Sequence, residues 1–210
     1  ILRSKEKKIG VIAVDPSSLI SGGSLLGDRT RMEQHSSDDN VFIRSLSSDG
    51  ALGGISHKSF LLSLVMATFN FDFIFVDCPP ALGLLTINSL VASNTTLIPL
   101  QSEFFALEGL SALMQTIKLI KQNFNSDLKI EGILLTMLDK RNSLSSLVEK
   151  DVRHHFGDQV YKTTIPRNVK ISEAPSHGKP ALVYDTQAAG SLAYIELAKE
   201  VILNQNKNYE

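Results

Sequence analysis

Short apolar runs alternate with segments of helical periodicity through most of this 210-residue sequence, and this alternation constrains its fold more than any other feature. Runs rich in Val, Ile and Phe predict buried strands, whereas apolar residues repeated every three or four positions predict helices. The predicted strands cover residues 8–14, 41–45, 71–76, 96–100 and 129–136, and the predicted helices cover residues 58–69, 84–92, 104–123, 144–156 and 190–203. We therefore expect an α/β fold whose mostly parallel sheet is covered by helices on both faces.

Composition narrows the classes of protein to which this chain can belong. Its 21 basic and 22 acidic residues give a net charge of −1, which carries no overall attraction for nucleic acid or an anionic membrane. The lone Cys78 excludes an internal disulfide and is typical of a reducing cytosol. No stretch approaches ~18–20 uninterrupted apolar residues, so we expect no membrane span and a cytoplasmic location. The sequence starts at Ile1 without a signal-peptide pattern, and we expect this start to fall partway through a domain.

Two of the predicted strands end on an aspartate, Asp15 in one case and Asp77 in the other. The carboxyl ends of parallel strands form the edge where such folds bind ligands, so both residues are candidate site residues. A carboxylate at the tip of a buried strand can hold Mg²⁺ through water. An aspartate followed by prolines, as Asp77 is, can instead cap the next helix. Spacing alone leaves both interpretations of Asp77 open.

The segment Gly22–Thr30 (GGSLLGDRT) has the glycine spacing of a phosphate-binding loop, but Asp28 occupies the position of the lysine. A phosphate cradle needs a cation and free backbone N–H groups at that point. A carboxylate beside a triphosphate is repulsive unless a metal lies between them. We therefore interpret Asp28 as a Mg²⁺ ligand or as part of an ordinary loop.

A series of multi-residue motifs after residue 60 resembles the ParA/Soj chromosome-partitioning ATPases, which belong to the deviant-Walker P-loop NTPases with a Rossmann-like parallel sheet. The motifs are DCPPALGLLTINSL (77–90), IPLQSEFFALEGLSALMQTI (98–117), EGILLTMLDKRNSLS (131–145), YKTTIPRNVKISEAPSHGKPALVYD (161–185) and GSLAYIELAKEV (190–201). The resemblance covers about residues 60–203. It implies that Asp77 is the Walker-B aspartate for Mg²⁺ and that Pro79–Leu84 is the switch segment. It also implies an adenine pocket formed by Met137, Asp139, Pro166 and Arg167.

The first quarter, about residues 8–59, is similar to a different family, the GTPases that chaperone adenosylcobalamin-dependent methylmalonyl-CoA mutase. In that family the residues matching Asp15 and Asp28 lie in the Mg²⁺ and switch region. In the partitioning ATPases the residue matching Asp15 helps to orient the attacking water. We expect residues 1–210 to form one α/β NTPase-like domain that joins two related parts near Ser59.

Both families place a lysine-bearing phosphate loop before the strand that starts here at Lys8, and no segment of the 210 residues supplies one. The expected fold therefore lacks the first strand and the P-loop. Because that loop contributes most of the charge stabilisation in phosphoryl transfer, we expect the chain as given to be inactive. Two alternative interpretations are a GTPase chaperone of a cobalamin-dependent mutase and a non-catalytic remnant or chimeric fusion.

The resemblance to partitioning ATPases also implies cofactors and partners. These are ATP with Mg²⁺, an ATP-dependent homodimer, a ParB-like centromere-binding protein and nonspecific DNA on the nucleoid. Weak DNA binding is expected from a set of basic residues in the C-terminal half: Arg153, Lys162, Arg167, Lys170, Lys179 and Lys199. The five histidines show no metal-ligand spacing, and we interpret them as surface or packing residues.

Overall fold

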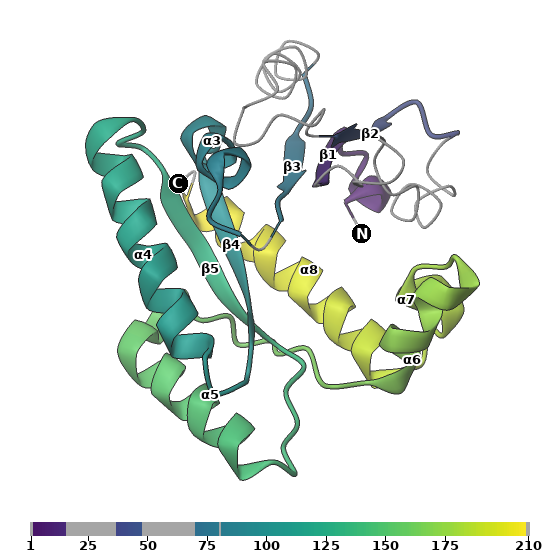
Figure 1. Cartoon of the computed structure of the whole chain (residues 1–210). Coiled ribbons are helices and arrows are strands. Elements are labelled where there is room, and N and C mark those ends of the chain that lie inside the picture. Colours follow the sequence, from purple (N-terminus) through teal and green to yellow (C-terminus); the bar gives the residue numbers. More distant parts are fainter. Residues whose placement is uncertain (1, 16–36, 48–69, 80, 209–210) are drawn as a thin grey trace. The chain divides into compact units, whose positions relative to one another are not determined.

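The computed structural model describes residues 2–15, 37–47, 70–79 and 81–208 (Figure 1). It divides into two compact units, Ile1–Ser93 and Asn94–Glu210. The helix predicted over residues 58–69 and the candidate site residue Asp28 lie outside the described residues. The expectation of one domain over residues 1–210 stays a prediction.

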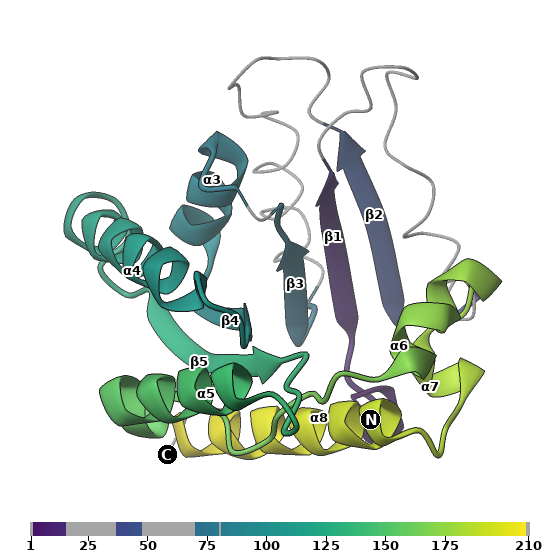
Figure 2. The same ribbon diagram turned by 60° about the horizontal axis from the view of Figure 1, so that its bottom comes forward.

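The first unit contains a three-stranded parallel sheet of order β2-β1-β3, built from β1 (Ile9–Asp15), β2 (Val41–Ser47) and β3 (Phe73–Asp77). Figure 2 shows the three strands side by side with their arrowheads at the same end. In the register of β1 and β3, Ile9 pairs with Phe73 and Ala13 pairs with Asp77. The strands that end on the two candidate aspartates are therefore neighbours, as the sequence predicts.

A small apolar core holds this sheet to the helix that follows it, α3 (Leu84–Ala92). Ile12 at the centre of β1 is 1% exposed, and the partly buried side chains of Phe71, Ile74, Val76 and Leu85 pack against it. Because Leu85 belongs to the first turn of α3, this cluster fixes where the helix begins relative to β3. The chain between β3 and α3 is thus anchored at both ends.

The second unit is built on β4 (Thr95–Gln101) and β5 (Lys129–Thr136), which pair in parallel with Gln101 opposite Thr136. Its long helices are α4 (Ala106–Asn123), α5 (Ser143–Phe156) and α8 (Ala189–Asn208). Short elements lie between α5 and α8: η3 (Gly157–Gln159), α6 (Val169–Glu173), η4 (Ala174–His177) and α7 (Ala181–Tyr184). The first unit adds one more short turn, η1 (Arg3–Lys5).

Both faces of β5 are covered. Residues 132–135 are all buried, although successive side chains of a strand point to opposite faces. On one face, Leu134 packs with Tyr161 and with Leu197 of α8. Figure 1 shows α4 along one side of the β4–β5 pair and α8 along the other. Leu110, Ile117 and Ile120 form the buried stripe of α4, as the sequence periodicity predicts.

The predicted fold class is confirmed at this level, because every pairing between the named strands is parallel and helices cover the strands. Each long helix and strand predicted within the described residues is present, with bounds that differ by a few residues at most. The strand pairings form one three-stranded and one two-stranded sheet in the described part of the chain. No helix in that part is long and apolar enough to cross a membrane.

Candidate functional site

Asp77 is the last residue of β3, and its side chain is exposed at the carboxyl edge of the first sheet. Its neighbour in β1 is Ala13, so the backbone of Asp15, two residues further along β1, lies at the same edge. The side chain of Asp15 lies outside the described part of the chain. The fold therefore brings the two strand ends together at the ligand-binding edge of a parallel sheet.

The helix-cap interpretation of Asp77 is wrong. The N-cap of α3 is Gly83, and no side chain caps this helix. The segment after Asp77 is instead held from the helix itself, because the buried hydroxyl of Thr86 donates to the carbonyl oxygens of Pro79 at 3.3 Å and Ala81 at 2.7 Å. The metal-binding interpretation of Asp77 stays a prediction, and these two bonds tie Pro79 and Ala81, in the segment predicted to be the switch, to α3.

Within the described ranges, no three His, Cys, Asp or Glu side chains gather closely enough to hold a metal ion. Mg²⁺ usually keeps several waters and takes one or two carboxylates together with substrate phosphates. A single exposed carboxylate at a strand end fits that mode of binding. Beside it, burial raises the pKa of the Cys78 thiol, and the charge of Asp77 acts in the same direction, so the thiol stays protonated at neutral pH.

The second unit contains a cavity of about 710 Å³ at the carboxyl ends of β4 and β5. Three of the four residues predicted to form the adenine pocket line it: Met137, Asp139 and Arg167. The fourth, Pro166, lies beside them, because it pairs with Leu138 in a parallel bridge. The remaining lining residues are Leu100, Gln101, Ser102, Glu103, Phe104, Phe105, Ala106, Gly109, Leu110, Asn142, Leu144 and Ser145.

Hydrogen bonds between main-chain groups hold the two halves of this predicted set in place. The Leu138 N–H donates to the Ile165 carbonyl, and the Arg167 N–H donates to the Leu138 carbonyl, both at 3.0 Å. Met137 adopts a left-handed backbone conformation with φ +52°. A side chain disfavours this conformation, and such strain is concentrated at ligand-binding and active sites. It turns the chain sharply where β5 ends.

Both carboxylate oxygens of Asp139 accept hydrogen bonds from the nearby Arg141. Its Oδ1 accepts hydrogen bonds from the backbone N–H of Arg141 at 3.1 Å and from its Nε at 3.0 Å, while Oδ2 accepts from a terminal nitrogen of the same guanidinium at 3.0 Å. These bonds lower the pKa of Asp139 to about 2, with a smaller contribution from the charge of Arg167. The carboxylate is therefore ionised at any physiological pH, and both of its oxygens already have donors.

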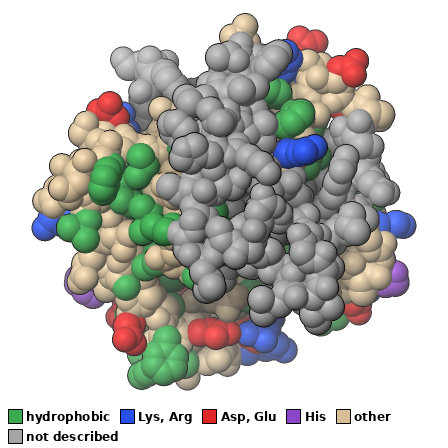
Figure 3. Space-filling view, turned by 45° about the horizontal axis from the view of Figure 1, so that its top comes forward, with side chains coloured by type: hydrophobic (Ala, Val, Ile, Leu, Met, Phe, Trp, Pro, Cys, Tyr) green, Lys and Arg blue, Asp and Glu red, His purple; other side chains and the backbone are tan. Residues whose placement is uncertain are grey.

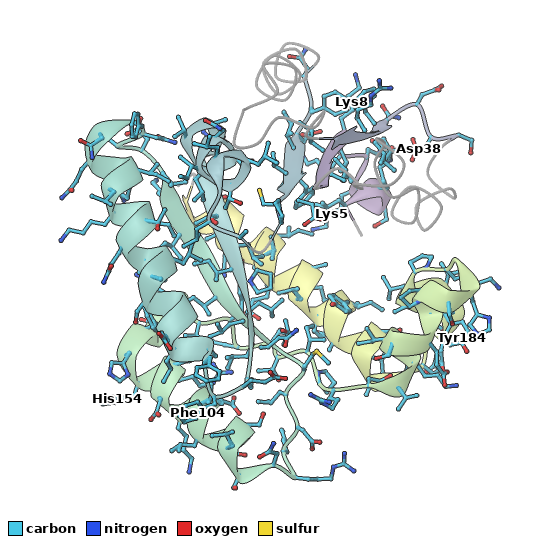
Figure 4. The ribbon with its side chains drawn as sticks, in the orientation of Figure 1. Lys5, Lys8, Asp38, Phe104, His154 and Tyr184 are labelled. Atoms are coloured by element: carbon cyan, nitrogen blue, oxygen red, sulfur yellow. The ribbon has the colours of Figure 1, made fainter. Side chains whose placement is uncertain are left out.

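The loop between β4 and α4 forms a second wall of the cavity that the sequence analysis did not assign. Glu103 in this loop lies 3.6 Å from a terminal nitrogen of Arg167. The rings of Phe104 and Phe105 meet edge to face with their centroids 5.1 Å apart, and the two residues are 69% and 72% exposed. Figure 4 shows Phe104 where the chain enters α4. The sequence contains one clue to this wall. The loop follows a predicted parallel strand, and loops at the carboxyl ends of such strands form ligand sites.

Curated proteins similar to this chain include proteins named Soj and ParA. The sporulation initiation inhibitor protein Soj of Bacillus subtilis is 56% identical over 135 residues, which are 64% of this chain and 53% of Soj. The chromosome partitioning protein ParA of Caulobacter vibrioides is 51% identical over 155 residues, which are 72% of this chain and 58% of ParA. The chain thus spans little more than half the length of these relatives. Their similarity confirms the predicted resemblance to ParA/Soj partitioning ATPases.

The N-terminal part matches a different family. A family model described as "Methylmalonyl Co-A mutase-associated GTPase MeaB" matches residues 1–81. This confirms the second resemblance that the sequence predicts. The match extends past Ser59, where we expected the two parts to join, and reaches the segment that follows Asp77.

Solved structures confirm the fold class. Cobyrinic acid a,c-diamide synthase from Mycobacterium smegmatis with bound ADP and magnesium superposes with a TM-score of 0.69 at 24% identity, over 99% of this chain and 86% of that one. A plasmid partition protein from Borrelia burgdorferi bound to AMPPNP gives a TM-score of 0.67 at 20% identity, over 99% and 89% of the two chains. The chain therefore shares its fold with these two nucleotide-bound proteins.

Proposed function

We propose that this chain carries the base-binding and Mg²⁺-binding part of a ParA/Soj-type ATPase that segregates chromosomes or plasmids. The observation that carries the proposal is the cavity at the carboxyl edge of β4 and β5, where Met137, Asp139 and Arg167 meet. These residues lie in the part of the sequence that resembles the partitioning proteins. The cavity has room for a purine base and an apolar lining that suits one.

In this proposal the adenine of ATP lies against Met137, Asp139, Pro166 and Arg167. Asp77 would hold a hydrated Mg²⁺ ion, which would supply positive charge beside the phosphates. Asp15 would position the water for hydrolysis, and Asp28 would be a further Mg²⁺ ligand. Protein groups in such a reaction act mainly by positioning reactants and stabilising charge.

The phosphate groups need a cradle that these 210 residues do not contain, because no segment matches Gly-x-x-x-x-Gly-Lys-Ser/Thr. We therefore propose that the polypeptide as given has no ATPase turnover of its own. With a phosphate loop supplied, ATP-dependent dimerisation, a ParB-like partner and nonspecific DNA on the nucleoid would complete the partitioning cycle.

Binding of the base can be tested without the phosphate loop. The chain contains four methionines, Met32, Met66, Met114 and Met137, so a spectrum of ¹³C-labelled methionine methyl groups contains four signals to assign. The Met137→Leu variant identifies the signal of Met137. Adenosine at millimolar concentration should shift this signal and leave that of Met114 in place. A shift of Met137 by guanosine but not by adenosine would refute the proposal.

The same titration discriminates the second candidate function. The match of residues 1–81 to the mutase-associated GTPase family favours a GTPase chaperone of a cobalamin-dependent mutase. That function requires a guanine site. A response to guanosine or GTP at any methionine, with none to adenosine, would favour it.

A further inference from the structure

The cavity in the second unit is lined by two carboxylates, and the structure distinguishes them sharply. Asp139 accepts three hydrogen bonds from Arg141, so neither of its oxygens is left without a donor. Glu103 lines the same cavity from the loop between β4 and α4. Its side chain is 62% exposed, and its partner Arg167 lies at 3.6 Å, which is longer than a hydrogen bond.

Hydrogen bonds hold the backbone of Glu103 in place, although its side chain is exposed to solvent. The Glu103 N–H donates to the Gln101 carbonyl at 2.9 Å, and the Glu103 carbonyl accepts from the Ala106 N–H at 3.0 Å. These bonds hold the residue in a tight turn before the first turn of α4. A fixed backbone that carries an available carboxylate is a pre-organised hydrogen-bond acceptor.

The pairing of Glu103 with Arg167 leaves this acceptor available. The two side chains are 62% and 54% exposed, and an exposed ion pair with a long separation contributes little to stability. A carboxylate accepts hydrogen bonds only, so its natural ligand partner is an N–H group. The exposed ring of Phe105 lines the same cavity and offers an aromatic surface for a planar ligand.

We infer that Glu103, and not Asp139, is the specificity-determining carboxylate of this cavity, and that it accepts a hydrogen bond from the exocyclic amino group of a purine base. This inference rests on the proposed function, which places adenine in the cavity. Asp139 is then a positioning residue that holds Arg141 and the turn after β5. Glu103 instead distinguishes bases that carry an amino donor from bases that do not.

The test compares adenosine with purine riboside, which lacks only the 6-amino group. The full 210-residue chain is titrated with each nucleoside, and the dissociation constants are read from the methyl signal of Met137. Adenosine should bind about three- to tenfold more tightly than purine riboside, as one charge-assisted hydrogen bond at a partly exposed site provides. In Glu103→Ala this ratio should fall to about one.

Two control variants show whether the change in the ratio is specific to Glu103. Glu108→Ala removes an exposed carboxylate from the first turn of α4 that does not line the cavity, and it should keep the wild-type ratio. Asp139→Asn should also keep the ratio, even where it lowers the affinity for both nucleosides by disturbing the turn. A ratio that survives Glu103→Ala, or one that is lost in Asp139→Asn alone, overturns the inference while the adenine site stands. Absence of any adenosine shift in the wild-type chain overturns the proposed function itself.

Discussion

The ring of Tyr161 lies directly against the backbone of Gly132 in β5, so closely that a Cβ built on Gly132 would come within 2.5 Å of Tyr161 Cε2 and 2.9 Å of its Cζ. Tyr161 is 3% exposed and packs with Leu134 and Ile165. Its backbone N–H also donates to the Ile133 carbonyl at 2.9 Å. The ring therefore has little freedom to move away, and residue 132 has room only for glycine.

We predict that Gly132→Ala lowers the free energy of unfolding by about 1–3 kcal/mol, because overpacking a rigid site forces strained side chains and backbone shifts. Urea denaturation followed by circular dichroism measures this change. Gly109→Ala is the matched control, since Gly109 lies inside α4 with nothing within 4 Å of the added methyl group. That variant should gain about 0.5–1 kcal/mol from reduced backbone entropy in the unfolded chain. Equal effects of the two substitutions would contradict this account of the contact.

Glu131 lies next to Gly132 in β5 and carries a buried oxygen, Oε1, that has no hydrogen-bond partner among the described residues. Burial raises the pKa of its carboxyl, and a hydrogen bond with Thr95 opposes the shift only in part. The folded pKa thus lies above the unfolded one, and the charged form is penalised in the folded state. The penalty is fully present above the folded pKa and disappears as the pH falls through it toward the unfolded value of 4.5.

We therefore predict that Glu131→Gln stabilises the chain at pH 7 and has no stabilising effect near pH 4. The difference in unfolding free energy between variant and wild type should shrink steadily between these pH values. Chemical denaturation at a series of pH values measures it. A Glu131→Gln chain that is less stable than wild type at pH 7 would show that the ionised carboxylate is satisfied after all.

The sequence predicts the strands and long helices because each has a strong local signal. The apolar runs around Ile12 and Ile74 identify β1 and β3, and the shared ancestry of the two resembling families places these strands side by side. The short helices α6 and α7 were not predicted, since five and four residues are too few to show a periodic pattern.

The sequence predicts site residues only where they belong to a motif of a known family. Met137, Asp139 and Arg167 were assigned from the resemblance, and the structure places all three around one cavity. The hydrogen bonds that occupy Asp139 depend on the conformation of the turn to Arg141, which no spacing rule specifies. The wall from Ser102 to Phe105 likewise depends on how β4 and β5 pair. Sequence patterns give positions along strands and helices, whereas these contacts arise from non-local packing.

For catalysis, we predict that the 210-residue polypeptide shows no measurable turnover of ATP or GTP and binds either nucleotide with a dissociation constant above ~1 mM. The reason is the missing phosphate cradle, whose backbone N–H groups and lysine supply most of the affinity. Phosphate release and calorimetry with Mg²⁺ measure both quantities. A micromolar dissociation constant for either nucleotide would contradict this prediction.

Adding an N-terminal strand and a Lys-Gly-Gly-x-Gly-Lys-Thr-Thr loop should restore turnover, with ATP preferred over GTP. In that repaired chain, Asp77→Asn should abolish turnover, because a neutral amide is a poor partner for hydrated Mg²⁺. Asp127→Asn, at an exposed position in the turn before β5, should leave turnover unchanged. Full activity of the Asp77→Asn chain would remove Asp77 from the proposed metal site.

Most of the basic residues that the sequence predicts to bind DNA lie beside acidic side chains, which largely neutralise their charge. Four of them form ion pairs: Arg153 with Glu149, Arg167 with Glu103, Lys170 with Glu173 and Lys199 with Glu196. Lys162 interacts electrostatically with Glu200, whose carboxylate also accepts its backbone N–H. On the face in Figure 3, described basic and acidic side chains likewise occur next to one another. Lys179 is exposed, and no ion pair to it occurs among the described residues.

We therefore predict that DNA binding by this chain is weak, independent of sequence and easily displaced by salt. Few phosphates are neutralised, so the logarithm of the binding constant should fall with the logarithm of the salt concentration with a slope of only about −2 to −3. Lys179→Glu should weaken binding to all duplexes alike and reduce the slope by about one. Lys118→Glu, on the exposed surface of α4, is the control that should change neither quantity. Fluorescence anisotropy with unrelated duplexes between low and moderate salt measures all of these. A preference for one duplex that persists at high salt would require base contacts, and the nonspecific binding proposed here would then be wrong.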